Sequence, residues 1–362
     1  MLKISYPNIG EYERVVYRFL EKIINKDTCE ILRPSLNSNE TVLLGEKSSP
    51  SYVCSPFKYT LGTMIDSLNK GANVIIQIGG GCRFGYYAEV QEKILKKDLG
   101  HEFIFINLYN GNKLDIKNAY DKLKILNPKI TIRKVLLELN YTMNLLKQID
   151  NMQSYVRDRI SDLEDRKSGK KIENIYYDKL LNSKNVKEIH IVYKEFIKKF
   201  NNLITNNKNK LKIGIVGELY SLMDPFASSF LENELIEKGY KIKRYTTASY
   251  LLFDKKKEEI ELLKKSQKYI KYRLGADGTE SVAHTLELIE EGYDGVIHIK
   301  PFGCTPEINA MPILKKISQD HSFPIMFYTF DSLNSRVGME TRIEAFIDML
   351  EMRKENEILC WS

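Results

Sequence analysis

The stretch from Val74 to Gly85, with the sequence VIIQIGGGCRFG, limits most strongly what this chain can fold into. Its β-branched apolar residues predict a buried strand, and three consecutive glycines then leave the following turn without side chains. Cys82 stands at the end of this turn, and a helical pattern follows over residues 86–97. A strand, a glycine turn, a reactive side chain and a helix in this order are typical of an α/β protein that presents a ligand or catalytic group at the carboxyl edge of its sheet.

Length and charge restrict the class of protein. A chain of 362 residues, 43% of them hydrophobic, is too long for one ordinary core and predicts two domains. No apolar run is long enough to span a bilayer, and the first residues lack a signal-peptide core, so we expect a cytoplasmic protein without a membrane partner. The net charge of +7 comes from scattered lysines. It therefore indicates a solvated surface rather than a nucleic-acid interface, although it would suit a phosphorylated cofactor ester.

The pattern of strands and helices divides the chain into three parts. Residues 1–115 alternate strand and helix patterns, residues 116–210 form a helical segment that ends in the polar linker NNKNK, and residues 211–362 alternate again. Repeated strand–helix units predict mostly parallel sheets with right-handed crossovers. The expected strands are 3–6, 29–32, 73–78, 102–108, 211–218, 241–245, 295–299 and 324–329. The expected helices outside the middle segment are 11–25, 61–69, 86–97, 229–238 (closed by Gly239), 258–272, 281–291, one from about 308, and 341–353.

The cysteines are odd in number and widely spaced, which argues against a disulfide framework and favours metal or redox use of some of them. They are Cys29, Cys54, Cys82, Cys304 and Cys360. We expect Cys29 and Cys360 to be ordinary thiols, because neither stands in a turn before a helix.

Cys54, Cys82 and Cys304 share one setting. Each follows an apolar, strand-like segment, lies beside proline or glycine, and precedes a helix. Such positions belong to the carboxyl edge of a parallel sheet, and helix N-termini favour thiolates. We therefore expect a shared site between the domains. A cation lies close to each cysteine in sequence: Lys58, Arg83 and Lys300.

The number of thiolates indicates which metal centre the three cysteines would bind. The chain lacks the paired spacings of a structural zinc module, so zinc is the weaker choice. Three thiolates on a [4Fe–4S] cluster would leave one iron open to water, sulfide or a substrate oxygen. No Walker loop is present, and the glycine turn is out of register with a dinucleotide-binding fingerprint. The five histidines form no ligand spacing, and His298 has the pattern of a core residue.

Four segments of the sequence resemble a known family. They are VCSPFKYTLG (residues 53–62), GGGCRFGYY (79–87), KPFGCTPE (300–307) and GMETRIEAF (338–346). The residues of these segments, and the order in which the segments follow one another, are similar to those of the 2-hydroxyacyl-CoA dehydratase D-component family, which includes the double-cubane-cluster reductases. The resemblance extends over both α/β halves, and the helical middle has none of these segments.

This resemblance implies two Rossmann-like domains with an iron–sulfur cluster between them, held by Cys54, Cys82 and Cys304. The cofactor would be a [4Fe–4S] cluster, alone or as half of a double cubane. An ATP-hydrolysing iron–sulfur activase would supply a low-potential electron. The dehydratase would use it to form a ketyl radical on an acyl-CoA, or to reduce another small molecule. A second dehydratase-type subunit or a homodimer is the other implied partner.

Further roles are assigned as hypotheses. Gly81, Gly303 and Lys300 would contact the cofactor. Glu307, Lys58 and Arg83 are the candidate catalytic residues, although an acid in the first turn of a helix is more often a cap, which is the favoured interpretation of Glu307. Two other functions stay open: a non-catalytic iron–sulfur electron carrier or scaffold subunit, and a metal-free CoA-binding α/β protein.

Overall fold

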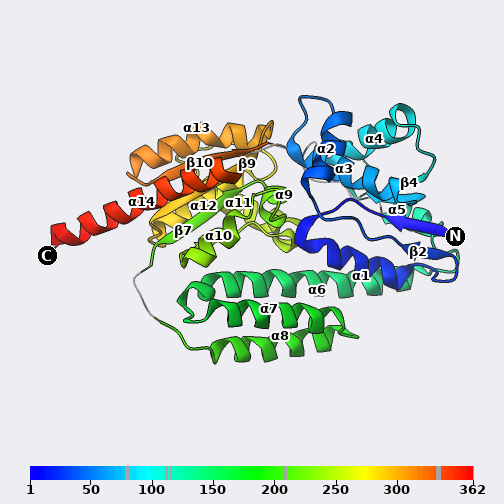
Figure 1. The fold of residues 1–362 in the computed structure, drawn as a ribbon, viewed down its shortest axis with the longest axis horizontal. Helices are drawn as coiled ribbons and strands as arrows, with labels where there is room; N and C mark the ends of the chain where they lie inside the picture. Colours follow the sequence, from blue (N-terminus) through cyan, green and yellow to red (C-terminus); the bar gives the residue numbers. More distant parts are fainter. Residues whose placement is uncertain are drawn as a thin grey trace. The chain divides into compact units, whose positions relative to one another are not determined.

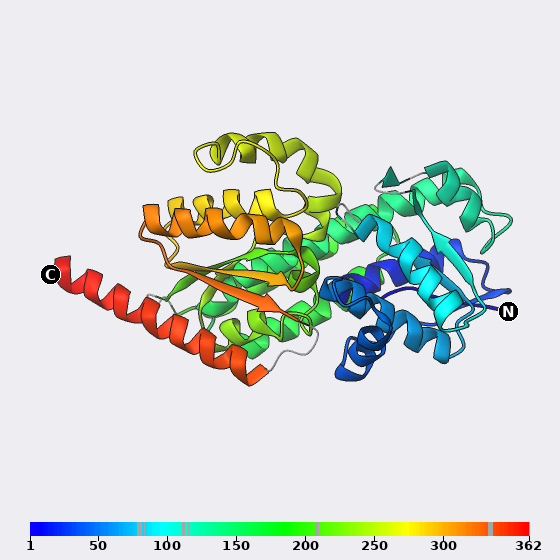
Figure 2. The ribbon, with the colours of Figure 1, turned by 90° about the horizontal axis from the view of Figure 1, so that it is seen from above.

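The computed structural model describes residues 1–77, 82, 84–110, 113–114, 116–206, 210–331 and 336–361. The chain forms two compact units, Met1–Leu145 and Leu146–Ser362. Each contains a four-stranded parallel sheet with helices around it (Figures 1 and 2). The predicted α/β class with two Rossmann-like parallel sheets is therefore confirmed. The boundaries 1–115, 116–210 and 211–362 stay a prediction about the domains.

The first unit places its sheet between two helical layers. Its strands are β1 (Leu2–Ser5), β2 (Cys29–Ile31), β3 (Val74–Gln77) and β4 (Ile104–Asn107), in the order β2-β1-β3-β4. Side chains alternate along β3, so that Val74 and Ile76 pack in a cluster with Leu20 of α1 (Glu13–Ile23). Ile75 belongs to the opposite cluster, with Leu61 of α3 (Ser55–Asn69). Burial on both faces explains why this strand is a continuous apolar run.

The second unit repeats this topology. Its strands are β7 (Lys212–Gly217), β8 (Lys241–Lys243), β9 (Gly295–Pro301) and β10 (Ile325–Phe330), and their order is β8-β7-β9-β10. Gly214 faces Leu288 of α12 (Gly278–Glu290), whereas Gly295 faces Leu350 of α14 (Arg336–Trp361). A β-carbon at Gly214 would lie 2.3 Å from the Leu288 side chain. These glycines let a helix pack tightly on each face of the sheet.

The remaining elements connect and cover the two sheets. They are η1 (Gly10–Tyr12), α2 (Asn39–Ser48), α4 (Phe84–Lys93), η2 (Ile94–Asp98), β5 (Tyr109–Asn110), β6 (Lys113–Leu114), α5 (Ile116–Leu123), α6 (Ile132–Arg159), η3 (Ile160–Asp162), α7 (Arg166–Leu181), α8 (Val186–Asn201), α9 (Leu219–Met223), α10 (Leu231–Lys238), η4 (Tyr250–Asp254), α11 (Lys255–Lys265) and α13 (Thr305–Asp320). Gly239 ends α10 in the left-handed conformation, with φ of 95°, as its position in the sequence predicts. Within the described residues, no helix combines the length and the apolar character needed to cross a membrane.

Two neighbouring helices differ from the sequence expectation. Helix α2 was not expected; it begins with a capping box in which Ser38 accepts from the backbone N–H of Thr41. Helix α3 begins at Ser55 rather than at about residue 61. The two helices cross with their backbones in contact, because a β-carbon on Gly45 would lie 1.9 Å from the carbonyl oxygen of Lys58. Gly62 makes the reciprocal approach to α2.

Helices α6, α7 and α8 form the helical layer that the middle of the sequence predicts (Figure 1). Tyr176 of α7 donates a hydrogen bond to the carbonyl of Gln148 on α6 at 2.8 Å. Its ring also lies 5.5 Å from that of Phe196 on α8. An aromatic core of this kind ties the three helices to one another.

Candidate functional site

Cys304 occupies the end of the third strand of the second unit. It follows β9 through a tight turn in which Gly303 has φ of 79°, and it is the N-cap residue of α13. Its side chain is 9% exposed. The first helical turn, which includes Pro306, directs backbone N–H groups toward the cap, and these groups favour a negatively charged sulfur.

Cys82 has the corresponding place in the first unit, after the third strand, β3. Its carbonyl accepts from the backbone N–H of Gly85 at 3.1 Å, at the start of α4. In both sheets the third strand lies beside the first, at the point where the strand order reverses, which is where ligands bind in such folds. The glycine turn itself, with Gly81, and the cation Arg83 lie outside the described residues.

Cys54 is in a different setting from the other two. The expectation that it follows a strand is wrong, because residues 49–54 form a connection between helices α2 and α3. Pro50, in this short connection, and Pro56, just after it, have no backbone N–H to donate to a neighbouring strand. Cys54 is nevertheless the N-cap of α3, and its sulfur lies 2.9 Å from the hydroxyl of Tyr87 on α4. The structure therefore brings Cys54 against the helix that follows Cys82.

The two described cations near the cysteines differ in their surroundings. The Lys58 ammonium lies 2.8 Å from the carboxylate of Glu46, so a carboxylate of α2 neutralises its charge. Lys300 is buried on β9 and forms no ion pair with a described residue. Burial lowers the pKa of Lys300, whereas the charges of Cys304 and Glu307 act in the opposite direction. Within the described part of the chain, Lys58 of the first unit is therefore paired with a carboxylate, whereas Lys300 of the second unit is not in an ion pair.

A group of buried carboxylates adjoins the same edge, and sequence reasoning missed it. Its four members come from three segments: Glu218 after β7, Asp277 and Glu280 at the start of α12, and Glu307 in the first turn of α13. The ammonium of Lys255 lies 2.7 Å from Glu280 and 3.7 Å from Asp277. Nothing in the local pattern of any one segment indicates that the four carboxylates face one another.

Glu307 does not cap its helix, so the favoured interpretation of this residue is wrong. One oxygen, Oε2, lies 2.6 Å from Nε2 of His298 and accepts from the Ser281 hydroxyl at 2.9 Å. The other oxygen, Oε1, is buried and has no hydrogen-bond partner among the described residues. His298 is fully buried, as expected for a core residue, but its Nδ1 has no partner in the described part of the chain either. In the neutral tautomer with its proton on Nε2, the His298 imidazole donates that proton to Glu307. Its Nδ1 is then an acceptor.

Two carboxylates of this group have raised pKa values. Burial raises the pKa of Asp277 to about 7, because the charges of Glu218, Glu307 and Glu280 add to it and Lys255 offsets only part of the effect. Burial also raises the pKa of Glu218, while the backbone N–H groups of Ser221 and Tyr220 oppose the shift. The pKa of Asp277 therefore lies close to neutral pH, far above that of an ordinary aspartate.

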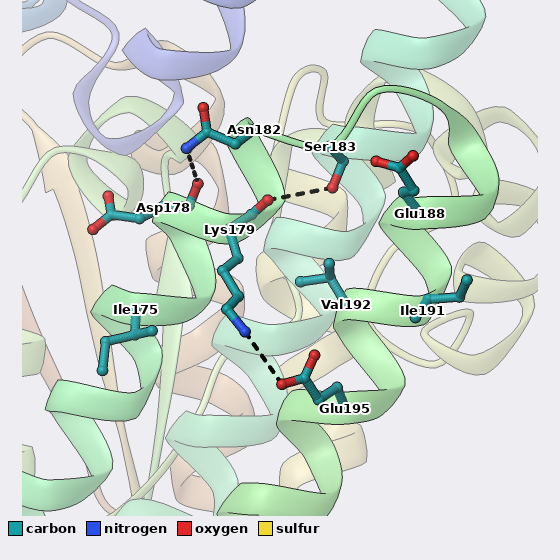
Figure 3. Close-up of a pocket in the computed structure, with 9 residues that line it drawn as sticks. All are labelled: Ile175, Asp178, Lys179, Asn182, Ser183, Glu188, Ile191, Val192 and Glu195. Atoms are coloured by element: carbon teal, nitrogen blue, oxygen red, sulfur yellow. Dashed lines mark hydrogen bonds and ion pairs between the residues drawn. The ribbon is translucent and has the colours of Figure 1, made fainter.

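The helical layer has a surface hollow of about 370 Å³ between α7 and α8 (Figure 3). It is open to solvent, and none of the predicted site residues lines it. Lys179 and Glu195 form an ion pair across it at 3.3 Å, and Asn182 donates to the carbonyl of Asp178. The Ser183 hydroxyl also donates to the carbonyl of Lys179 at 3.3 Å, so several polar groups of this hollow are already bonded to one another.

Comparison with known families identifies the chain. Over residues 104–350 the sequence matches the family described as 2-hydroxyglutaryl-CoA dehydratase, D-component. The protein belongs to the 2-hydroxyglutaryl-CoA dehydratase D-component family. The family match covers well over half of the chain and confirms the resemblance noted in the sequence. It includes Cys304 but begins after Cys54 and Cys82. No curated protein matches the sequence.

The three candidate cysteines of this D-component family member have positions that suit thiolate ligands of a metal cluster. Cys54 and Cys304 are helix N-caps, Cys82 lies just before a helix, and none of the three forms a disulfide. Cys54 and Cys82 belong to the first unit and Cys304 to the second. Within the described ranges, no three histidine, cysteine, aspartate or glutamate side chains are gathered to hold a metal ion. The assignment of all three cysteines to one cluster is therefore a proposal.

The raised pKa of Asp277 predicts a pH dependence of stability. The folded protein binds this proton more tightly than the unfolded chain, whose aspartates titrate near pH 3.8. The contribution is fully present below pH 4 and is lost as the pH rises to about 7, with a slope of up to about 1.4 kcal/mol per pH unit. Asp277→Asn should remove this part of the slope in urea unfolding between pH 4.5 and 7.5. An unchanged slope would show that another group holds the proton.

Proposed function

We propose that this chain is the iron–sulfur component of a low-potential reductase or dehydratase of the 2-hydroxyacyl-CoA dehydratase type, dependent on an ATP-hydrolysing activase. The match to the D-component family over residues 104–350 is the observation that carries the proposal. In this proposal Cys54, Cys82 and Cys304 hold a [4Fe–4S] cluster, alone or as half of a double cubane. The substrate is an acyl-CoA or another small molecule, and a second dehydratase-type subunit or a second copy of the chain completes the enzyme.

The position of the cysteines supports this assignment. Cys82 and Cys304 follow the third strand of two sheets that have the same strand order. The glycine turns before them, with Gly81 and Gly303, would let a bulky cluster approach the backbone. A bound [4Fe–4S] cluster would supply one low-potential electron and one iron that is open to a substrate oxygen.

The described residues around Cys304 have roles that fit this chemistry. The Lys300 ammonium, buried without an ion pair among the described residues, would attract a negatively charged substrate group. Glu307 is held by His298 and Ser281 and would accept or donate a proton at Oε1, which has no hydrogen-bond partner among the described residues. Asp277 would hold a proton near neutral pH. Lys58 and Arg83 stay weaker candidates for contact with substrate.

Anaerobic purification tests the proposal. After reconstitution with iron and sulfide, we expect about four irons and four sulfides per chain and a visible spectrum typical of a cubane cluster. Addition of an activase, ATP and a strong reductant should then reduce the cluster, and a suitable 2-hydroxyacyl-CoA should be turned over.

The possible outcomes separate the three functions. Iron and sulfide with reduction by the activase, but without a substrate effect on the spectrum across a panel of acyl-CoAs, would favour an electron carrier. A colourless chain that takes up no iron under these conditions would contradict both iron–sulfur functions. It would leave a metal-free CoA-binding protein, which direct binding of CoA would detect.

A further inference from the structure

The contact between Cys54 and Tyr87 points to a role for Tyr87, which is the last residue of the segment GGGCRFGYY and received no role from the sequence. The tyrosine hydroxyl lies 2.9 Å from the cysteine sulfur, and the tyrosine is 8% exposed. The Tyr87 ring also packs edge-on against Phe57 of α3, with the ring centres 4.8 Å apart. The hydroxyl is therefore held against the sulfur by packing of its ring and does not reach it as a flexible surface group.

A buried amide network fixes the same two helices. The side-chain amide of Gln91, on α4, donates to the carbonyl of Phe57 and to the hydroxyl of Thr60, both on α3. Gln77, the last residue of β3, donates to Gln91 at 3.0 Å. These bonds join the strand before Cys82, the helix after it and the helix that begins behind Cys54. Buried hydrogen bonds between these elements thus help to set the distance between Tyr87 and Cys54.

We infer that Tyr87 donates a hydrogen bond to the Cys54 sulfur when this cysteine is a cluster ligand, and that this bond raises the reduction potential of the cluster. The inference rests on the proposed function. A metal-bound cysteine is a thiolate and can only accept, so the tyrosine hydroxyl must be the donor. Reduction adds negative charge to the cluster and its sulfurs, which strengthens the hydrogen bond in the reduced state. Tyr87 is a positioning residue in this role, because it acts through Cys54.

Tyr87→Phe tests the inference, with Tyr86→Phe as the matched control. Tyr86 is the preceding residue and is 54% exposed, so its change removes a hydroxyl from the same helix without touching Cys54. Anaerobic titration followed by visible absorption and electron paramagnetic resonance gives the potential. At the wild-type midpoint potential, we expect the ratio of reduced to oxidised cluster to fall about tenfold in Tyr87→Phe and to stay unchanged in Tyr86→Phe.

Each other outcome has a definite meaning. Equal potentials in Tyr87→Phe and wild-type protein, with equal iron content, would overturn the inference. Loss of iron from Tyr87→Phe alone would overturn it too, because a bond that adjusts the potential is not required to hold the cluster. A wild-type protein that binds no iron would contradict the proposed function and would be recognised before either variant is compared.

Discussion

Cys304→Ser is expected to abolish uptake of the cluster. Wild-type protein reconstituted without oxygen should contain about four irons per chain, and the variant should contain fewer than about one. Serine oxygen is a poor ligand for iron, and the cluster would keep only two of its three protein sulfurs. Cys54→Ser and Cys82→Ser should give the same loss. These two variants extend the test to cysteines that lie before the family match.

Cys29→Ser is the control for these variants. Cys29 is more buried than the proposed ligands, but it begins β2, and its thiol donates to the carbonyl of Leu126 at 3.2 Å. This variant should keep its full iron content. Retention of iron and an unchanged resonance spectrum in Cys304→Ser would remove Cys304 from the ligand set. Loss in Cys29→Ser with intact helix content would show that the ligands have been assigned incorrectly.

Glu232→Gln is expected to lower the free energy of unfolding by about 3–5 kcal/mol at pH 7. Glu232, on α10, lies 2.6 Å from the guanidinium of Arg157 on α6 and 3.5 Å from that of Arg244, which follows β8. Both arginines are buried. Glu232→Gln removes the carboxylate that both arginines share. The two buried guanidinium charges, one on α6 and one after β8, then lose this negative partner. Urea unfolding of the two proteins measures the difference.

The pKa of Glu232 gives this prediction a pH signature. Burial alone would raise it, but the charges of Arg157 and Arg244 outweigh burial and hold the pKa at about 2. The stabilisation is therefore present above pH 4.5 and is lost as the pH falls toward 2, so the difference between wild type and variant should shrink in acid. Glu344→Gln is the control. Its carboxylate pairs with Lys238 at 3.0 Å but is 61% exposed, so its loss should cost less than about 1 kcal/mol. Equal effects of the two variants would contradict the argument from burial.

Much of the α/β framework could be predicted because its signals are local. The apolar residues of β3 and β9 are buried on both faces, and such strands read as continuous hydrophobic runs whatever their neighbours are. Gly239 ends its helix through its own backbone conformation. The places of Cys82 and Cys304, each after a third strand, followed from the same local patterns.

The surroundings of Cys54 could not be predicted in the same way. Helix α2 has only a weak apolar pattern of its own, and it is held by a backbone contact with α3 that needs glycine at both Gly45 and Gly62. Because that contact joins residues far apart in sequence, no local period reports it. The strand expected before Cys54 was wrong for this reason, and the partner of Lys58 on α2, Glu46, could not be predicted either.

Two parallel α/β sheets, the family and the candidate ligand cysteines could all be inferred from the chain's residues alone. Their signals lie within short segments: apolar periods, glycine turns and four family motifs. The groups around the cysteines became visible only once the chain was folded. Tyr87 reaches Cys54 across two helices, and Glu218, Asp277 and Glu307 meet because β7 and β9 are neighbours in the sheet. The energies of buried charges and hydrogen bonds depend on such distant neighbours, which strand order and helix packing select.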